Sequence, residues 1–114
     1  MRDRLLRWQW EGYPTYHTTR LNLWLHIVAV PAFLANLACL LLALVTMHWL
    51  SALESLLGMV LAFAVQGFGH KREREPAIPF NGPLDATTRI FVEQLVTFPR
   101  FVFSGKWLAA LKKA

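Results

Sequence analysis

The sequence is poor in cysteine and in acidic residues, and each shortage narrows the classes of protein to consider. Its single cysteine, Cys39, has no partner within the chain, so an intramolecular disulfide is excluded. Cys39 stands in the apolar stretch NLACLLLALV, where we predict a small buried side chain. Seven Asp and Glu residues oppose twelve Lys and Arg residues, which gives a net charge of +5. A basic chain that is also 55% hydrophobic must separate the two kinds of residue along its length.

The common signatures of soluble enzymes are also missing. The chain contains no HExxH zinc motif, no glycine-rich phosphate loop, no nucleophile elbow and no CxxC pair. Its lysines and arginines flank apolar runs and do not form a groove with stacking aromatic residues, so a nucleic-acid partner is not expected. The combination of apolar runs and basic flanks suits a membrane protein with a basic face.

Formal charge is absent from one long segment, residues 21–47. As a helix that rises about 1.5 Å per residue, this segment would reach ~40 Å, which is enough to cross a bilayer. A second run over residues 49–69, interrupted only by Glu54, is also long enough to span. Pro31 is predicted to kink or interrupt the first helix, because proline removes a backbone donor and crowds the preceding turn. The short link around His48 makes the two runs a helical hairpin.

The C-terminal third predicts structure of a different kind. After the hairpin, EPAIPFNGPLD contains three prolines and one glycine, which indicates an irregular loop. Residues 86–104 and 105–113 are amphipathic and basic, and Pro99 is expected to break the first of them. We therefore expect interfacial or re-entrant helices here, in place of a third clean span.

Three local features refine this C-terminal prediction. Asp85 stands just before the first amphipathic segment and is predicted to be its N-cap. Arg89 and Glu93 are spaced at i and i+4, which suits an ion pair on one helix face. Gly105 is predicted to end the first helix and separate it from the second.

We predict that residues 1–114 form one all-α domain, an integral membrane hairpin with an additional C-terminal amphipathic helix. The basic residues on its flanks are Arg2, Arg4, Arg7 and Arg20 before the hairpin and Lys71, Arg72 and Arg74 after it. By the positive-inside rule we expect both flanks on the cytoplasmic side of a membrane such as the bacterial inner membrane, with membrane lipid as a partner. A soluble two-helix core is the open alternative, since a buried helix can also be apolar all round.

The histidines are sorted by their distance from the turn. His26 lies 22 residues before His48, and His70 lies 22 residues after it. In a hairpin that turns near His48, each arm carries its histidine about 33 Å from the turn. His26 and His70 therefore return to the same level at the basic end, where His17, nine residues before His26, can join them. His48 is left at the opposite end.

Other polar residues accompany this group. Asn22 and Gln66 precede the two hairpin histidines by one helical turn, while Glu73 and Glu75 follow the second arm within reach of the site. Three imidazoles, with or without a carboxylate, form a reasonable ligand set for iron, zinc or copper. The plainer alternative is that each histidine is a hydrogen-bonded residue at a membrane interface.

Several stretches resemble a known family, the small membrane proteins related to the fungal 2-hydroxy fatty acid dioxygenase. YHTTRLNLWLHIVAVP is similar to the family's His-x4-Asn-x3-His followed by a proline. QGFGHKREREPA is similar to its Gln-x2-Gly-His with a following Glu and a Pro-Ala, although the approach to Pro-Ala is longer in many relatives. GPLDATTRIFVEQ resembles the family's Gly-Pro-Leu stretch before an amphipathic segment. Ala29 stands where many relatives have a glycine.

The resemblance implies a non-haem Fe(II) enzyme that uses dioxygen to shorten a 2-hydroxy fatty acid by one carbon, without 2-oxoglutarate. Carried over by position, the expected catalytic, metal-binding residues are His17, His26 and His70. The expected supporting residues are Asn22 and Gln66, and the candidate additional ligand or base is Glu73 or Glu75. The residues expected to neutralise the substrate carboxylate are Lys71, Arg72 and Arg74.

Two functions of other classes stay open. The first is a non-enzymatic membrane adaptor whose basic C-terminus binds anionic lipid or a partner protein, and bound transition metal would argue against it. The second is a haem protein with two axial histidines, which a Soret absorption band would reveal. A homo-oligomer is compatible with all three functions.

Overall fold

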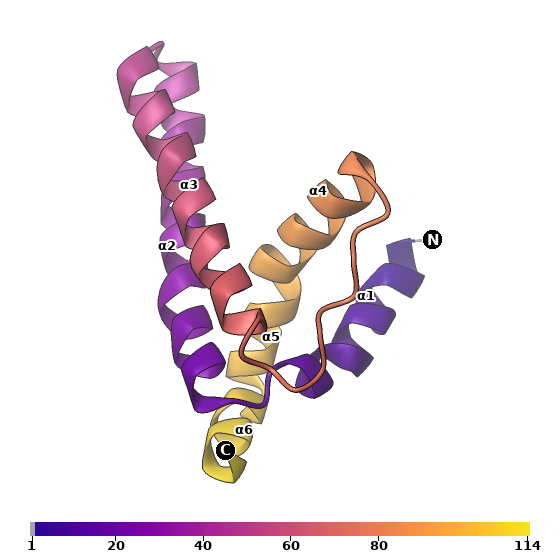
Figure 1. The fold of residues 1–114 in the computed structure, drawn as a ribbon. Coiled ribbons are helices and arrows are strands. Elements are labelled where there is room, and N and C mark those ends of the chain that lie inside the picture. The colour runs from indigo at the N-terminus through magenta and orange to yellow at the C-terminus, as the bar shows by residue number, and fades with distance from the viewer. Residues whose placement is uncertain (1) are drawn as a thin grey trace.

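The computed structural model describes residues 2–114, and over that range it contains helices and loops but no β-strand, which confirms the predicted all-α class. Figure 1 shows the order of the elements along the chain. They are α1 (Arg2–Gly12), the 3-10 turn η1 (Tyr13–Tyr16), α2 (Arg20–Val45), α3 (Trp49–His70), α4 (Pro83–Val92), the π-helical turn η2 (Glu93–Thr97), α5 (Phe98–Phe103) and α6 (Lys106–Lys113). Helix α1 is not among the elements predicted from the sequence.

Helices α2 and α3 form the antiparallel hairpin, with small side chains such as Ala43 and Ala52 buried between them. The link between the helices turns at Met47, whose φ of 59° lies in the left-handed region. Pro31 was predicted to kink or interrupt the first helix, but α2 continues through it without a break. Pro31 is exposed, so the backbone carbonyl that loses its donor faces away from the protein interior.

Both hairpin helices are long and apolar enough to cross a membrane. Only 22% of the apolar window of α2 and 28% of that of α3 are buried in the protein, whereas a core helix of a soluble protein would be mostly buried. The prediction that Cys39 is buried is wrong, because α3 covers only one side of α2 and Cys39 lies on the exposed side. The hairpin therefore presents apolar side chains to its surroundings along most of its length.

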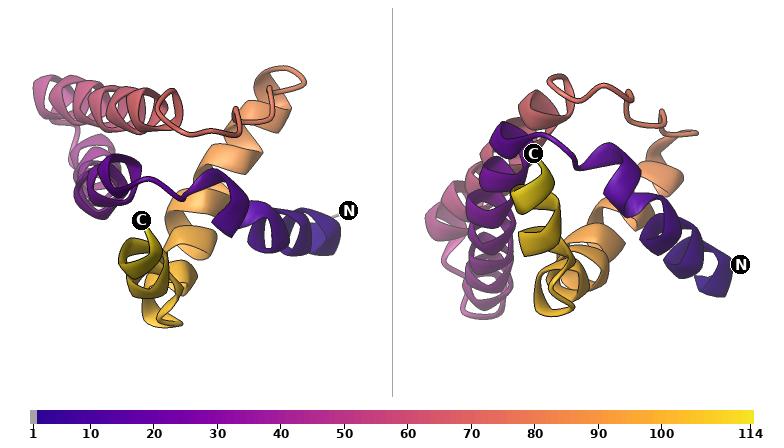
Figure 2. Two further views of the ribbon diagram at one scale, coloured as in Figure 1. Left: turned by 60° about the horizontal axis from the view of Figure 1, so that its bottom comes forward. Right: turned by 90° about the horizontal axis from the view of Figure 1, so that it is seen from below.

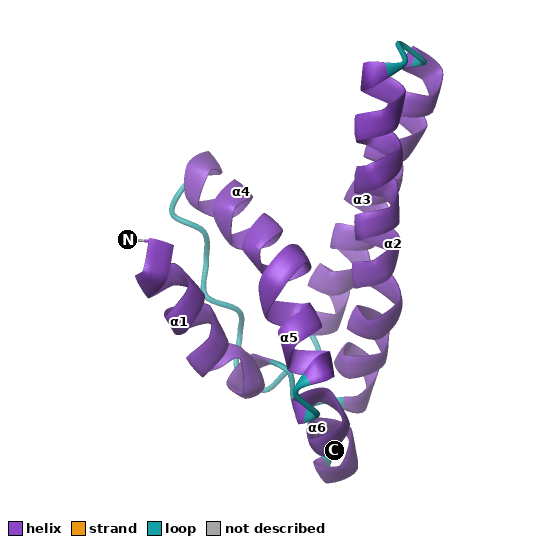
Figure 3. Cartoon of the chain, turned by 180° about the vertical axis from the view of Figure 1, so that it is seen from behind, coloured by secondary structure: helices purple, strands orange, loops and turns teal. Residues whose placement is uncertain are grey.

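A second helical arm crosses the basic end of the hairpin. Residues 83–103 are helical without interruption through α4, η2 and α5, and this arm diverges from the hairpin so that the two form a V (Figure 1). Figures 2 and 3 show α1 along the outer side of the arm and α6 at the closed end of the V. The indole nitrogen of Trp107 in α6 donates to the carbonyl of Leu23 at 3.0 Å and so ties the C-terminus to α2.

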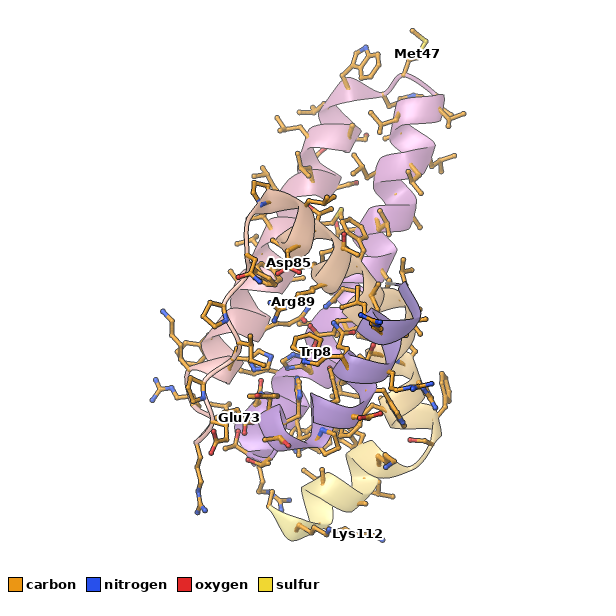
Figure 4. All side chains as sticks on the ribbon, turned by 90° about the vertical axis from the view of Figure 1, so that its right-hand side faces the viewer. Trp8, Met47, Glu73, Asp85, Arg89 and Lys112 are labelled. Carbon is orange, nitrogen blue, oxygen red and sulfur yellow. The ribbon has the colours of Figure 1, made fainter. Side chains whose placement is uncertain are left out.

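Two apolar clusters hold the arms together. The first lies at the closed end of the V and consists of Tyr13, Leu23, Val30, Phe98 and Phe101. The second lies between the hairpin and α4 and consists of Ala29, Phe33, Met59 and Ala62, with Ile90 and Phe91 packed against it. The second arm is thus anchored on the half of the hairpin that carries the histidines, while the tip near Met47 extends alone (Figure 4).

Two predictions about α4 are wrong. Asp85 is not its N-cap, because the helix begins earlier with Gly82 as N-cap and Pro83 in the first turn, where the fixed φ of proline suits a helix start. The Asp85 carboxylate instead accepts a hydrogen bond from the backbone nitrogen of Asn81 at 2.9 Å. Arg89 pairs with Asp85 at 3.3 Å, one turn before it, and not with the carboxylate one turn after it.

The end of the second arm contains one confirmed and one wrong prediction. Gly105, at φ 84°, separates α5 from α6 as predicted. Pro99 does not break the helix, because the π-helical turn η2 directly precedes α5. Proline lacks a backbone donor and crowds the carbonyl four residues before it, and a wider turn accommodates both effects.

Helix α3 packs tightly against Asn22 of α2 at Gly69. A Cβ atom at this position would run into the Asn22 side chain. Asn22 is not free to move, because its amide nitrogen donates to the carbonyl of Tyr16 at 3.3 Å and to the carboxylate of Glu73 at 2.9 Å. Glycine is therefore required here by packing.

Gly69→Ala is expected to destabilise the fold by about 1–3 kcal/mol, since the added methyl group overpacks the contact with Asn22. Gly67→Ala is the matched control, because no atom lies within 4 Å of a Cβ added there. It is expected to gain up to about 1 kcal/mol through helix propensity. Denaturant unfolding of both variants in detergent micelles measures the difference, and equal changes would contradict the packing requirement at Gly69.

Candidate metal centre

Four side chains from four parts of the chain meet at the closed end of the V. His17 follows η1, His26 lies in α2, His70 ends α3 and Glu93 begins η2. One ligand atom from each lies within 4.8 Å of the others. The ring centroids of the three histidines are 4.7–5.0 Å apart. The hairpin brings two of these histidines to one level, and η1 folds the third over them.

Backbone carbonyls orient two of the rings. Nδ1 of His17 lies 2.8 Å from the carbonyl of Tyr13, and Nδ1 of His26 lies 3.0 Å from that of Asn22. A carbonyl can only accept, so each Nδ1 donates its proton and each Nε2 keeps a free lone pair. These two Nε2 atoms, and Nδ1 of His70, are buried without a hydrogen-bond partner. Three unpartnered nitrogens facing one point are costly unless a ligand is bound there.

The carboxylate of Glu93 completes the group. Its Oε2 atom lies 3.6 Å from Nε2 of His17 and 3.5 Å from Nε2 of His26, and it accepts a hydrogen bond of 2.7 Å from the hydroxyl of Tyr13. Burial alone would raise the pKa of Glu93, but the neighbouring His17 and His26 lower it well below the usual range. Burial lowers the pKa of His17. A bound metal ion would favour both an ionised carboxylate and neutral imidazoles, because it binds their lone pairs.

The donor set fits a metal ion. Ligand atoms bound at about 2.0–2.2 Å from one ion lie roughly 2.8–3.6 Å apart at tetrahedral or octahedral angles. The distances from the Glu93 oxygen to the two histidine nitrogens, 3.5 and 3.6 Å, fall at the upper end of this range. Imidazole nitrogens and one carboxylate suit Fe(II) and Zn(II). Tyr13 would act as the outer hydrogen-bond partner that metal-bound carboxylates usually have.

Glu93 is not among the site residues predicted from the sequence. It lies 23 residues after His70, and its spacing to Arg89 suggested a surface ion pair. Two signals were available: Glu93 is the only acidic residue between residues 86 and 114, and it stands among apolar neighbours. A lone carboxylate in such a segment is costly to bury unless it has a partner.

The two carboxylates proposed from the sequence lie elsewhere. Glu73 is nearly buried and accepts hydrogen bonds from the backbone and hydroxyl groups of Thr18 and Thr19 and from the Asn22 amide. It therefore clamps the end of α3 to the start of α2 and is not in the metal-binding group. Glu75 is exposed and is also outside that group. The prediction of either as a ligand does not agree with this geometry.

Gln66 and Asn22 both lie close behind the cluster. Gln66 and Gln94 exchange two amide hydrogen bonds of 2.9 and 2.8 Å, and both side chains are buried. Since Gln94 adjoins Glu93, this pair joins η2 to α3 beside the site. Asn22 contributes its carbonyl to His26 and its amide to the Glu73 clamp.

Of the three basic residues proposed to meet a substrate carboxylate, only Lys71 lines the pocket next to the cluster. Arg72 lies over the Phe68 ring at 4.7 Å, and Arg74 is exposed. His48 stands at the hairpin tip, where its Nδ1 lies 2.8 Å from the Thr46 hydroxyl. His48 is thus far along the hairpin from the other histidines, as the spacing predicts.

A largely apolar pocket of about 670 Å³ opens beside the cluster. It lies between α3 on one side and α1, the loop after α3 and α4 on the other. His17, His70 and Glu93 form part of its wall, and Phe63, Ile78, Pro79, Phe80 and Ile90 are among its apolar residues. Figure 4 shows Trp8 and Arg89, which also line it, close to each other midway along the molecule.

The fold and this geometry define a class of small helical protein, in which an apolar hairpin and a second arm surround three histidines and a glutamate. The model of the 2-hydroxy-palmitic acid dioxygenase Mpo1-like family matches residues 4–104, and the chain belongs to that family. No curated protein and no solved structure matches the chain.

Replacing a ligand of the cluster is expected to abolish tight metal binding. His26→Ala and Glu93→Ala each remove one donor, while Tyr13→Phe removes only the outer hydrogen bond and should weaken binding about 10–100-fold. His48→Ala and Glu75→Ala are the matched controls and should bind as the wild type does. Anaerobic titration with Co(II), followed by its visible absorption, measures the affinity. Loss of binding in His48→Ala would contradict the assignment.

The Glu73 clamp predicts a specific pH dependence of stability. Burial raises the pKa of Glu73, but hydrogen bonds from Thr18, Thr19 and Asn22 outweigh it and lower the pKa from 4.5 to about 2. A lowered pKa stabilises the folded state fully above pH 4.5 and progressively less as the pH falls toward 2. The Tm difference between wild type and Glu73→Gln should therefore shrink over this interval. Glu75→Gln is the control, and a difference independent of pH would contradict the clamp.

Proposed function

We propose that the chain is a membrane-bound, Fe(II)-dependent dioxygenase that cleaves 2-hydroxy fatty acids. The bond between carbons 1 and 2 breaks, carbon 1 leaves as carbon dioxide, and carbon 2 becomes the carboxyl carbon of an acid one carbon shorter. Dioxygen accepts the four electrons released, and its two oxygen atoms balance one new carboxyl oxygen and one water. No other reductant or 2-oxoglutarate is needed.

The observation that carries this proposal is the set of three buried, unpartnered histidine nitrogens beside the Glu93 carboxylate. The family description supplies the substrate class, and the adjoining apolar pocket suits a lipid. Fe(II) held there would supply the redox-active centre at which dioxygen and a 2-hydroxy acid react. Zinc lacks redox chemistry and would not support this reaction.

The protein's own groups have separate tasks in this proposal. The Tyr13 and Asn22 carbonyls hold the rings of His17 and His26 in the tautomer that presents Nε2 to the metal. The Tyr13 hydroxyl fixes the carboxylate of Glu93. Lys71, on the pocket wall next to His70, offers a positive charge to the arriving carboxylate, and Arg72 and Arg74 add to the local positive field.

The same proposal places the protein in a membrane. The two apolar helices cross the bilayer, and the histidine-bearing basic end faces the cytoplasm, for instance at a bacterial inner membrane. The Trp107 indole and the terminal lysines of α6 lie at the closed end of the V, where they suit the interface between lipid and water. A fatty acid would then reach the site without leaving the membrane.

The test is an anaerobic Fe(II) titration in detergent micelles, followed by addition of dioxygen and 2-hydroxyhexadecanoic acid. We expect one molecule each of pentadecanoic acid and carbon dioxide per dioxygen consumed. His26→Ala should lower turnover at least 100-fold, whereas His48→Ala should leave it within about twofold of wild type. Zn(II)-loaded protein is the inactive metal control.

Two results would overturn the proposal. Protein that binds no transition metal and is unaffected by His70→Ala would indicate the membrane adaptor. A Soret band in the purified protein, lost in His26→Ala, would indicate the haem protein.

A further inference from the structure

The pocket runs away from the metal cluster along α3. Phe63, Gly67 and His70 all line it, and their spacing of four and three residues places them on one helix face. On the opposite wall, Ile90 and Glu93 face the same space from the second arm. His70 and Glu93 thus mark the polar end, and Phe63 lies about 10 Å farther along the helix axis from His70.

Gly67 stands out on this wall. A glycine inside a helix costs about 1 kcal/mol relative to alanine, so a compensating reason is expected. Gly58 and Gly69 have one, since a Cβ at either position would run into the side chain of Asn36 or Asn22. At Gly67 no atom lies within 4 Å of an added Cβ. Packing therefore does not explain Gly67, and the space next to it belongs to the pocket.

The outer wall of the pocket is held in place by Arg89. Its guanidinium donates to the carbonyls of Ile78 at 2.8 Å and Pro79 at 3.0 Å. It also lies over the rings of Phe80 at 4.5 Å and Trp8 at 5.1 Å. One side chain thus ties α4, the loop and α1 together, and it gives the irregular loop a defined apolar face.

We propose that this pocket holds the acyl tail of the substrate, and that Gly67 leaves room for the tail carbons nearest the head group. This inference rests on the proposed function, which puts the 2-hydroxy acid head group at the cluster. The pocket is continuous with His70 and Glu93, is largely apolar, and at about 670 Å³ falls within the size range of ligand pockets. The tail therefore lies inside the protein and not along the lipid-exposed hairpin.

A photoreactive substrate analogue tests the location of the tail directly. The probe is 2-hydroxyhexadecanoic acid with a diazirine in the middle of its chain, added to the Fe(II)-loaded protein in nanodiscs without dioxygen. Mass spectrometry of the cross-linked peptides is expected to find adducts around Phe63, Ile78 and Ile90. Adducts confined to Ala32 and Ala35, which are exposed on α2 at a similar distance from the cluster and do not line the pocket, would overturn the proposal.

Substitution of Gly67 tests the space requirement. Gly67→Leu adds a side chain to the pocket next to His70, while Gly67→Ala adds only a methyl group. Ala64→Leu is the matched control, because Ala64 lies one turn earlier on the exposed side of α3 and does not line the pocket. We expect Gly67→Leu to reduce pocket adducts at least tenfold, with Co(II) affinity unchanged and with Ala64→Leu at the wild-type level.

Chain length separates the two proposals. Gly67→Leu should lower kcat/KM at least tenfold for 2-hydroxyhexadecanoic acid but less than threefold for 2-hydroxybutanoic acid, which has almost no tail. Equal losses on both acids, or no loss on either, would overturn the tail assignment while leaving the dioxygenase proposal intact. Wild-type protein that labels in the pocket but converts neither acid would instead overturn the dioxygenase proposal and keep the pocket as an acyl-binding site.

Discussion

Three imidazole nitrogens buried without partners are the constraint on which the rest of this structure depends. Each would cost about 1–3 kcal/mol if left unsatisfied, so the fold must both hold them together and offer them a ligand. Backbone carbonyls fix two of the rings, the Gln66–Gln94 pair anchors the turn that carries Glu93, and Glu73 joins the ends of the two hairpin helices. These contacts hold the cluster at the point where both helical arms meet.

The parts that could be predicted from the sequence are those governed by local geometry. A helix has a fixed rise, so counting residues from the turn was enough to bring His26 and His70 to one level. Two long apolar runs predicted the helices of the hairpin, and the glycine at position 105 predicted the boundary between α5 and α6. The family resemblance, based on three short stretches of which two surround these histidines, agrees with the family match over residues 4–104.

The parts that could not be predicted depend on how the second arm packs. Glu93 reaches the cluster only because the arm crosses the basic end of the hairpin, and no residue count along the chain describes that crossing. Glu73 was nearer in sequence, but two threonines and Asn22 at the start of α2 offer it five donors and hold it away from the histidines. Distance along the sequence from His70 therefore did not identify the carboxylate at the cluster. The hydrogen-bond donors that hold Glu73 decided which glutamate lies there.

The π-helical turn at residues 93–97 determines which side chains the second arm presents. In a regular α-helix, positions 93 and 98 would point about 140° apart. Here both reach His26: the Glu93 carboxylate is 3.5 Å from its Nε2, and the Phe98 ring centroid is 5.8 Å from its ring. If the same residues followed a regular α-helical path, without the wide turn, the two side chains would point to different sides of the helix. In this arm, an irregular backbone is what keeps an acid and an aromatic ring on the same side of a helix.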